Sequence, residues 1–434
     1  MNQFLEKMTG HKEVNKEIIF LLLIGGLYAL SIALSNTFVN VFLWKQSGEF
    51  TDLALYNLAV VVMQPITFIL AGKWAKKIDR IIVLRLGVSF LSIFYVTVLA
   101  SGKNASSFLL LLGGLLGVGY GFYWLAFNVL TFEITEPETR DFFNGFFGVL
   151  TSLTGMIGPI VAGWVISSLE AFTGYTIIFS ISLGLFVGAV LLSMFIKRRP
   201  AHGTYSFKRI LHERKNNRNW QKILHASFFQ GLREGAVMFV ISVWVYITTN
   251  SELALGTFGL VNSAVAFVFY FLATKFIKPT HRMKAILLGG LMLYGSVFLL
   301  IFDLSFPRLI MYAVVIAIAY PTLLVPYMSL VYDVIGKAWR AAEMRIEYIV
   351  VRELYLNLGR IVSILLFLMF VTFFNEERGV PLLLTIIGAG HLIIYFFVKG
   401  IDVAENKERS EGEEKAYPRV PHRRLADGEG GSTV

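Results

Sequence analysis

The chain of 434 residues contains no cysteine, which excludes disulfide bonds, thiolate metal sites and cysteine nucleophiles. Charged residues make up only 16% of it, whereas a typical soluble protein carries about 25%. Two kinds of motif are also missing: a glycine-rich phosphate loop ending in Lys-Ser or Lys-Thr, and HExxH or another cluster of metal ligands. These absences exclude an ATP-driven pump and a metal centre, and we expect neither a cofactor nor an enzymatic activity.

Apolar residues dominate the composition. They account for 56% of the chain, with 38 Phe, 18 Tyr and 7 Trp among them, and they fall into twelve runs. At about 1.5 Å of rise per residue, each run is long enough to cross the hydrocarbon core of a bilayer as a helix. The sequence therefore predicts an all-α polytopic membrane protein with twelve transmembrane helices. The predicted spans are 18–44, 53–73, 82–100, 106–131, 142–167, 172–196, 222–248, 256–276, 284–302, 307–332, 346–373 and 380–399.

The basic residues are distributed unevenly between the two sides of the predicted membrane. The formal net charge of +10 taken alone would suggest a nucleic-acid partner. However, 32 of the 39 Lys and Arg residues fall on the side that carries both chain ends, four fall on the other side and three lie within spans. Basic residues concentrate on the cytoplasmic side of membrane proteins. We therefore expect no nucleic-acid partner, a plasma-membrane location and cytoplasmic N- and C-termini.

A long polar loop divides the spans into two groups of six, and the two groups are similar in sequence. At an offset of 202 residues, Leu70 matches Leu272 and Gly87 matches Gly289, with basic residues in register between them. We predict two six-helix pseudo-repeats, an arrangement that in transporters places the substrate site between the halves near the middle of the membrane. The predicted organisation is an N-terminal segment at 1–17, bundles at 18–196 and 222–400, a central cytoplasmic loop at 197–221 and a disordered tail at 401–434.

The turn between the second and third spans contains Gly72, Lys76, Asp79 and Arg80. With twelve spans and a long central loop around it, this turn resembles the hallmark motif of the major facilitator superfamily, which begins with Gly and ends in basic residues. Two positions depart from that motif, because Lys76 stands in place of an acidic residue and Asp79 in place of a second Gly. We expect Asp79 to supply the displaced negative charge. The resemblance, to a poorly characterised bacterial branch, covers 17–400 and implies the fold and the transport function of the superfamily.

The fifth span contains a second motif, LTGMIGPIVAGW, with Gly155, Gly158, Pro159 and Gly163. This pattern resembles the Gly-Pro motif of exporters of the antiporter type in the same superfamily. The resemblance implies that these four residues, like those of the basic turn, take part in the conformational change. It also favours transport out of the cell.

Arg233 and Glu234 lie in the middle of the seventh span, within FFQGLREGAVMFVI. Each ionisable side chain at a helix centre costs roughly 2.5–3.5 kcal/mol on insertion scales, and such residues face the bundle interior or water and mark functional sites. In the superfamily the first helix of each three-helix unit lines the central cavity, and the resemblance puts this pair on such a helix. The alternative is an Arg–Glu pair that only holds span 7 to a neighbour, although adjacent helical residues point about 100° apart and need separate partners.

The eleventh span contributes a polar face. Glu353, Asn357 and Arg360 are spaced four and three residues apart, which places them on one side of a helix, with Arg352 beside them. Arg352, Asn357 and Arg360 are candidates for substrate binding, and a buried network between spans 7 and 11 is an equally weighted alternative. Proton coupling needs a group that titrates, and a low dielectric favours the protonated form of a carboxylate. Glu234 and Glu353, both deep in the spans, are therefore the candidate proton carriers.

Aromatic and amide side chains are the expected apolar part of the site. On the fourth span, Tyr120, Trp124 and Asn128 recur four residues apart and share a face. On the tenth span, Tyr320 and Tyr327 lie two turns apart. We regard all five as substrate-binding candidates, with plain helix packing as the alternative.

The candidate residues predict a secondary transporter that works by alternating access. The leading prediction is proton-coupled export, by antiport, of an amphiphilic small molecule or a lipid-linked substrate. Its apolar body would meet the aromatics of span 4, and its polar or anionic head would meet Arg233 or Arg360. A proton-coupled uptake symporter and a transporter-like scaffold or sensor are the alternatives. The expected partners are the substrate, protons and membrane lipids, the chain is expected to be a monomer, and His391 in span 12 is expected, from the family topology, to be peripheral and structural.

Overall fold

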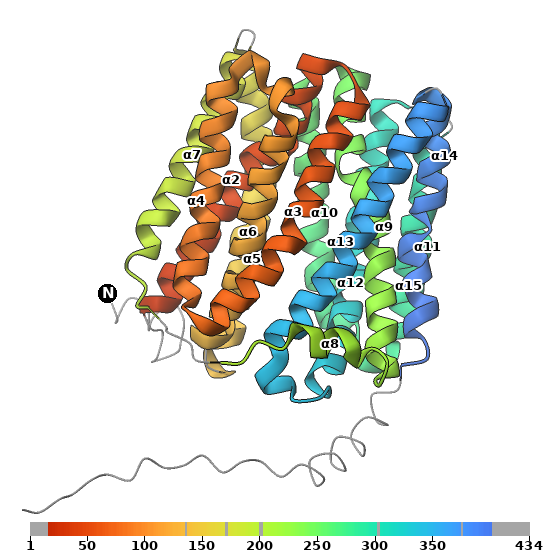
Figure 1. Ribbon diagram of the computed structural model, residues 1–434. Helices are drawn as coiled ribbons and strands as arrows, with labels where there is room; N and C mark the ends of the chain where they lie inside the picture. The colour runs from red at the N-terminus through yellow and green to blue at the C-terminus, as the bar shows by residue number, and fades with distance from the viewer. Residues whose placement is uncertain are drawn as a thin grey trace, which may run out of the picture.

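The structure, a computed structural model, contains only helices as regular secondary structure within the residues that it describes (Figure 1). This confirms the predicted all-α class. The predicted N-terminal segment up to residue 15 and the tail from residue 402 lie outside the described residues. The described ranges are 16–134, 137–169, 172–198, 203–301, 304–374 and 376–401.

The third and fourth predicted spans form one apolar stretch from Arg80 to Thr131. The structure divides it at the short 3₁₀ helix η1, where Gly102 has a φ of +50° and Asn104 leaves helical geometry. The described residues contain eleven long apolar helical stretches. Because this stretch crosses the membrane twice, they make twelve crossings.

The helices of the first half of the chain are α2 (Lys16–Ser47), α3 (Phe50–Lys77), α4 (Arg80–Ser101), η1 (Gly102–Phe108), α5 (Leu109–Ile134), α6 (Pro137–Ser168) and α7 (Thr173–Ser193).

The last predicted span is also divided. Its two helices, α14 and α15, form one apolar stretch, Arg378–Val398, that is interrupted at Ala389. The central loop contains a short helix, α8, that its polar sequence did not predict. The elements of this half are α8 (Phe207–Glu213), α9 (Arg218–Thr249), α10 (Glu252–Phe276), η2 (Pro279–His281), α11 (Arg282–Ile301), α12 (Phe306–Gly336), α13 (Ala341–Phe373), α14 (Glu376–Gly388) and α15 (Gly390–Val398).

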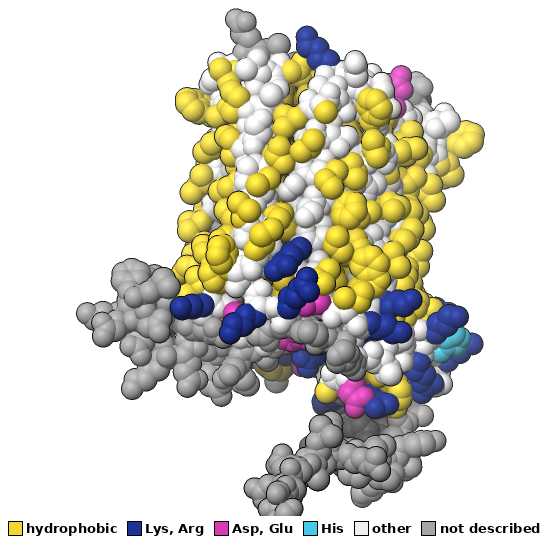
Figure 2. Space-filling model, turned by 60° about the vertical axis from the view of Figure 1, so that its left-hand side comes forward, with side chains coloured by type: hydrophobic (Ala, Val, Ile, Leu, Met, Phe, Trp, Pro, Cys, Tyr) yellow, Lys and Arg dark blue, Asp and Glu magenta, His cyan; other side chains and the backbone are white. Residues whose placement is uncertain are grey.

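The long helices cross the molecule in roughly the same direction. Figure 1 shows α2–α7 gathered on one side and α9–α15 on the other. α8 lies at one end of the bundle, which we call the α8 face, together with the start of α2 and the end of α15. Figure 2 shows apolar side chains over the flank of the bundle and Lys and Arg side chains gathered toward the α8 face. An apolar flank with a basic end is the surface expected of a membrane-spanning bundle.

Backbone contact between α9 and α13 fixes the centre of the second half. A Cβ added at Gly231 would lie 1.9 Å from the carbonyl oxygen of Leu356, and one added at Gly359 would lie 2.0 Å from that of Phe228. Small residues allow membrane helices to approach this closely. Because a larger side chain would push the helices apart, the two glycines bring the polar residues of α9 and α13 within reach of one another.

The repeat predicted from the sequence places a glycine at the same kind of helix contact in each half. Gly87 of α4 packs against α5, where its added Cβ would lie 2.4 Å from the backbone nitrogen of Tyr123. Gly289 of α11 packs against α12, where its added Cβ would lie 2.8 Å from the backbone nitrogen of Leu323. In both halves the glycine thus joins the third span to the fourth, at the 202-residue offset found in the sequence.

Candidate functional site

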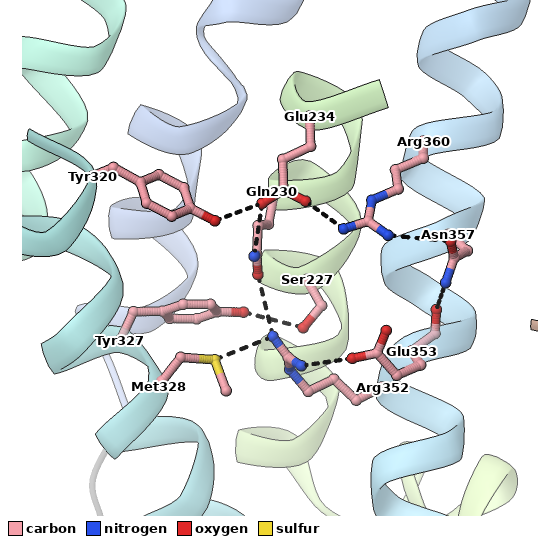
Figure 3. A network of polar contacts seen from close by, with 10 residues as sticks. All are labelled: Ser227, Gln230, Glu234, Tyr320, Tyr327, Met328, Arg352, Glu353, Asn357 and Arg360. Atoms are coloured by element: carbon pink, nitrogen blue, oxygen red, sulfur yellow. Dashed lines mark hydrogen bonds and ion pairs between the residues drawn. The ribbon is translucent and has the colours of Figure 1, made fainter. Parts of the chain in front are cut away.

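The carboxylate of Glu234 lies where α9, α12 and α13 meet (Figure 3). Its Oε2 pairs with Nη2 of Arg360 on α13 at 2.7 Å. Its Oε1 accepts hydrogen bonds from the hydroxyl of Tyr320 on α12 at 3.1 Å and from Nε2 of Gln230, one turn earlier on α9, at 3.0 Å. One acidic side chain therefore ties together three helices that the sequence places far apart.

A second set of contacts lies toward the α8 face of this group and is centred on Arg352. Its Nη1 pairs with Oε1 of Glu353 at 3.1 Å, and its Nη2 donates to Oε1 of Gln230 at 3.3 Å. The Sδ of Met328 on α12 lies 3.2 Å from the same Nη2. Gln230 therefore bridges the two sets, because its amide nitrogen reaches Glu234 and its amide oxygen reaches Arg352 (Figure 3).

The polar face predicted for the eleventh span forms a hydrogen-bonded ladder on α13. Asn357 donates to the backbone carbonyl of Glu353 at 2.9 Å, and Arg360 Nη1 donates to Oδ1 of Asn357 at 3.4 Å. On α12, the hydroxyl of Tyr327 is hydrogen-bonded to Oγ of Ser227 on α9 at 3.1 Å. The structure thus brings together seven of the predicted site residues: Glu234, Tyr320, Tyr327, Arg352, Glu353, Asn357 and Arg360.

The ion pairs of this cluster are largely removed from solvent. The side chains of Arg360 and Glu234 are 18% and 11% exposed, and those of Arg352 and Glu353 are similarly covered. Removing one partner of a buried pair typically costs about 3–5 kcal/mol, because the other charge is left without a partner. A proton that reaches Glu234 would neutralise the carboxylate without removing any atom, so it would release Arg360 while the packing of the site remains.

Arg233 and Glu234 point to different neighbours, as their adjacent positions on one helix require. Arg233 lies against the start of α15, where a Cβ added at Gly390 would be 3.2 Å from its Cβ. The next residue, His391, is fully buried, and its Nε2 lies 3.9 Å from Oε1 of Glu234. The expectation that His391 is peripheral is therefore wrong. Gly390 lets α15 approach α9 closely, and this approach carries the imidazole into the charged cluster.

Gln230, Met328 and Ser227 were not among the predicted site residues. Gln230 did carry a signal, since it is a polar residue in an apolar run and lies one turn before Glu234. Ser227 and Met328 carried none, because single serines and methionines are ordinary constituents of membrane helices. For His391 the signals were the histidine itself, an ionisable residue in an apolar run, and the small-residue stretch Gly388–Gly390 that precedes it.

The predicted aromatic residues of the first half make their contacts with α2. Tyr120 of α5 donates to Oδ1 of Asn36 at 3.1 Å, and Trp124 meets the ring of Tyr28 edge-on with centroids 5.3 Å apart. Both side chains, like that of Asn128, remain only half-buried. They form a group separate from the charged cluster of the second half.

A buried ion pair joins the two halves at the α8 face. Nζ of Lys76 on α3 pairs with Oε1 of Glu347 on α13 at 2.6 Å, and Glu347 is fully buried. The central loop is held in the same place, because Lys76 also donates to the carbonyl of Thr204 at 3.1 Å and the N–H of Ser206 donates to Glu347 at 3.0 Å. We call these four residues the α8-face latch. A Cβ on Gly72 would lie 2.9 Å from the hydroxyl of Tyr205 in this loop, so the glycine of the basic turn makes room for it.

Asp79 has a different position from the one expected. Its carboxylate caps α4 by accepting hydrogen bonds from the N–H groups of Ile81 at 2.7 Å and Ile82 at 3.4 Å, and Arg80 pairs with Glu133 at 2.7 Å. The acidic partner of Lys76 is Glu347, from the other half of the chain. The charge displaced from the motif is therefore replaced across the interface, and this partner is distant in sequence.

The opposite face holds a second pair between the halves. Lys45 at the end of α2 pairs with Oε1 of Glu252 at the start of α10 at 2.8 Å. The hydroxyl of Tyr175 donates to the same oxygen at 3.0 Å, and the Lys45 ammonium lies 5.5 Å from the ring centroid of Tyr246. Ion pairs therefore join the two halves at both ends of the bundle.

The Gly-Pro stretch of α6 also lies at the contact between the halves. A Cβ added at Gly155 would be 3.1 Å from Oγ of Ser263 on α10, and one at Gly163 would be 2.5 Å from the carbonyl oxygen of Glu252. The ring of Pro159 packs against Gly259 of α10, and its carbonyl oxygen lies 2.4 Å from a Cβ added at Gly256. Gly158 faces the other way, toward α2. The motif thus permits close packing of α6 on two helices, one in each half.

The twelve apolar crossings of the described residues, with a buried charged cluster in the second half, define a multi-pass membrane transport protein. A family model described as Major Facilitator Superfamily matches residues 21–344, and the chain belongs to that family.

Three proteins illustrate the similarity. The uncharacterized protein YqgE of Bacillus subtilis (strain 168) is 61% identical over 426 residues, which cover 98% of this chain and 99% of that protein. The multidrug transporter protein MdtP of the same organism is 30% identical over 172 residues, or 38% of this chain and 30% of that protein. A crystal structure of the nucleoside transporter NupG, in mutant form, superimposes with a TM-score of 0.67 at 13% identity, over 89% of this chain and 100% of that one, and shows the shared fold.

Proposed function

We propose that the protein exports an amphiphilic small molecule or a lipid-linked substrate by proton antiport, with Glu234 as the residue that carries the proton. In this proposal it resides in the plasma membrane with both termini in the cytoplasm, as the distribution of basic residues predicts. The observation that carries the proposal is the position of Glu234, a membrane-embedded carboxylate bonded to α9, α12 and α13 at once.

Protonation of Glu234 is a physical means of coupling. The charged carboxylate attracts Arg360 and accepts from Tyr320, whereas a neutral acid has no charge to hold the guanidinium. Losing this attraction destabilises the arrangement of α9 and α13 relative to any other that solvates Arg360. A proton therefore shifts the balance between two conformations, as coupling through a two-state element requires.

Antiport requires the substrate and the proton to exclude one another. A polar head that donates hydrogen bonds to the ionised Glu234 meets this condition, because protonation removes the acceptor that it needs. The half-buried aromatic side chains of α5, Tyr120 and Trp124, are the proposed contacts for the apolar body. Two observations favour export: the packing of the Gly-Pro stretch between α6 and α10, and the partial similarity to a multidrug transporter.

One observation favours the second candidate, proton-coupled uptake. The cluster contains three arginines (Arg233, Arg352 and Arg360) but two glutamates, so an anionic head group would be attracted to it. An anion bound to Arg360 would displace Glu234, and the displaced carboxylate would then take up a proton more readily. Anion and proton would bind together, which is symport. The charge of the head group and the direction of coupling are therefore linked.

The test begins with ligand identification. Thermal stabilisation of the purified protein against sugars, amino acids, amphiphilic drugs and glycolipids identifies ligands, since a ligand at 100 times its dissociation constant stabilises by about 2.7 kcal/mol. Uptake of the best ligand is then measured in proteoliposomes with an imposed pH gradient of either sign. Accumulation driven by an acidic interior indicates antiport, and accumulation driven by an acidic exterior indicates symport. No flux of any ligand that binds would contradict transport and favour the scaffold.

The variant Glu234→Gln tests the role of the carboxylate, because glutamine keeps its size and one acceptor oxygen. Because glutamine, like the protonated acid, lacks the negative charge, we expect substrate binding to weaken and to lose its dependence on pH, and gradient-driven accumulation to fall at least tenfold. Glu353→Gln is the matched control, since Glu353 pairs with the adjacent Arg352 on its own helix. Loss of coupling in Glu353→Gln with coupling intact in Glu234→Gln would transfer the role to Glu353.

A further inference from the structure

Arg233 and His391 form a polar site with unused hydrogen-bonding groups. Arg233 is 5% exposed, and its Nε and Nη2 have no hydrogen-bond partner among the described residues. His391 is fully buried, and neither ring nitrogen has a hydrogen-bond partner in that part of the chain. Buried polar groups are nearly always satisfied, so two neighbouring exceptions call for an explanation such as a bound ion.

The carboxylates of the cluster do not neutralise Arg233. Glu234 is the next residue in sequence, but it points away on the helix and pairs with Arg360 at 2.7 Å. Glu353 pairs with Arg352 at 3.1 Å. Within the described cluster, Arg233 is therefore the positive charge left without a carboxylate. A buried ionised group is unfavourable unless it is paired, and an anion from outside the chain would supply the missing charge.

The packing of α15 on α9 places the two side chains together. A Cβ added at Gly390 would lie 3.2 Å from both the Cβ and the backbone nitrogen of Arg233, and 2.5 Å from the carbonyl oxygen of Phe229. His391 follows directly, and its ring is close enough to Arg233 for the two groups to interact electrostatically. Its Nε2 faces Oε1 of Glu234 at 3.9 Å, which leaves Nδ1 as the ring nitrogen turned away from that negative charge.

We propose that Arg233 and His391 bind a small monovalent anion, either an inorganic ion or a carboxylate. The guanidinium of Arg233 supplies the charge and the Nε–H and Nη–H donors, and the imidazole supplies an Nδ1–H donor. The site is distinct from the Glu234–Arg360 pair, and it does not depend on proton coupling or on transport. Two sources of the anion share this chemistry, a free halide and the carboxylate group of a larger ligand.

The test measures the unfolding temperature of the full-length protein, purified in detergent without chloride. The intrinsic fluorescence of its 7 Trp residues reports unfolding. Sodium gluconate, the bulkiest of the four anions, is the reference salt and is replaced stepwise by sodium chloride, bromide or acetate at constant ionic strength. We expect a saturable rise in Tm of about 2 °C or more for at least one small anion. If halides alone produce it, a free ion occupies the site. If only carboxylates do, and longer chains do so at lower concentration, the site belongs to a larger ligand.

Variants identify the site. The rise should disappear in Arg233→Gln and weaken in His391→Asn, which keeps a polar side chain of similar reach. It should persist in Arg378→Gln, the same substitution at an exposed position. An equal rise in Arg233→Gln and in the unchanged protein would overturn the proposal, and so would the absence of a saturable rise with every anion.

A direct measurement covers the case in which Arg233→Gln does not fold. Crystals of the unchanged protein are soaked with bromide or with a brominated carboxylate, and the anomalous signal of bromine locates the anion. We expect a peak within hydrogen-bond distance of the Arg233 guanidinium. A map with bromine peaks elsewhere and none beside Arg233 and His391 would refute the site without any substitution.

Discussion

Replacing Lys76 by methionine should open the α8-face latch. Methionine keeps the length and the apolar stem of the side chain but removes the ammonium that bonds to Glu347 and to the carbonyl of Thr204. Glu347 would then stay fully buried and, among the described residues, would keep the N–H of Ser206, at 3.0 Å, as its hydrogen-bond donor. The carboxylate gains solvation if α3 and α13 separate, so the substitution destabilises the closed arrangement more than an open one.

The size of the effect follows from the burial of the pair. Breaking a buried ion pair by removing one partner costs about 3–5 kcal/mol. Taking about 3 kcal/mol, at 1.4 kcal/mol for each factor of ten, the ratio of open to closed molecules rises roughly 100-fold. The double variant Lys76→Met, Glu347→Leu removes both charges, and replacement of a buried pair by apolar groups is often neutral or stabilising. We therefore expect the ratio of open to closed molecules in the double variant to return toward that of the unchanged protein.

The absence of cysteine makes the assay simple, because an introduced thiol is the only one present. Val350 is fully buried at the contact of α13 with α3, where a Cβ on Gly72 would lie 3.1 Å from its Cγ2. In a Val350→Cys background, alkylation by a soluble maleimide measures how often this contact opens. The rate should rise by about two orders of magnitude in Lys76→Met and return toward the starting rate in the double variant.

Two outcomes would refute this reasoning. An unchanged alkylation rate in Lys76→Met would mean that the pair does not hold the halves together. Equal increases in the single and the double variant would mean that the ammonium acts through its own contacts with the backbone carbonyls rather than by neutralising Glu347. The exposed variant Lys103→Met is the control for loss of a lysine as such.

The remaining predictions concern packing and capping, and Tm measures both. Gly359→Ala should lower Tm by several degrees, because its Cβ would lie 2.0 Å from the carbonyl oxygen of Phe228 and overpacking typically costs about 1–3 kcal/mol. Gly295→Ala on α11, where the added Cβ would lie more than 4 Å from every other described helix, should leave Tm nearly unchanged, and equal losses in the two variants would contradict the close contact of α9 and α13. Asp79→Ala should cost about 1 kcal/mol by removing the N-cap of α4, whereas Asp79→Asn, which keeps an acceptor, should cost less.

The sequence alone identified the ionisable residues that lie within the predicted membrane spans. Arg233, Glu234 and Arg360 interrupt apolar runs, and an ionisable group in such a run faces the interior or water. Helical spacing also placed Glu353, Asn357 and Arg360 on one face, where the structure shows them joined by hydrogen bonds. These inferences needed only the length of the runs and the helical period, which are local properties of the chain.

The length of the apolar runs and the helical period could not predict which residues on different helices form ion pairs. Glu234 bonds to Arg360 rather than to its neighbour in sequence because α9 and α13 meet at Gly231 and Gly359, and glycines of this kind occur throughout the chain. The same holds for Lys76, whose partner Glu347 lies 271 residues away in the other half. Periodicity defines the face of a helix but not the depth or angle at which two helices cross, and these decide which charges meet.

The two halves of the chain make the same helix crossing, but only the crossing in the second half contains a charged residue. In the first half, Gly158 of α6 crosses Ala33 of α2, with 2.6 Å between the added Cβ and the Ala33 Cβ. The 202-residue offset carries Ala33 to Gly235 and Gly158 to Arg360, and these two cross in the second half, where a Cβ on Gly235 would lie 2.6 Å from the Arg360 carbonyl oxygen. The same crossing is therefore built once from two small apolar residues and once from a glycine and an arginine. Since the first half makes the contact without a charge, packing does not require the guanidinium of Arg360, and the coupling proposed for Glu234 gives that charge a role.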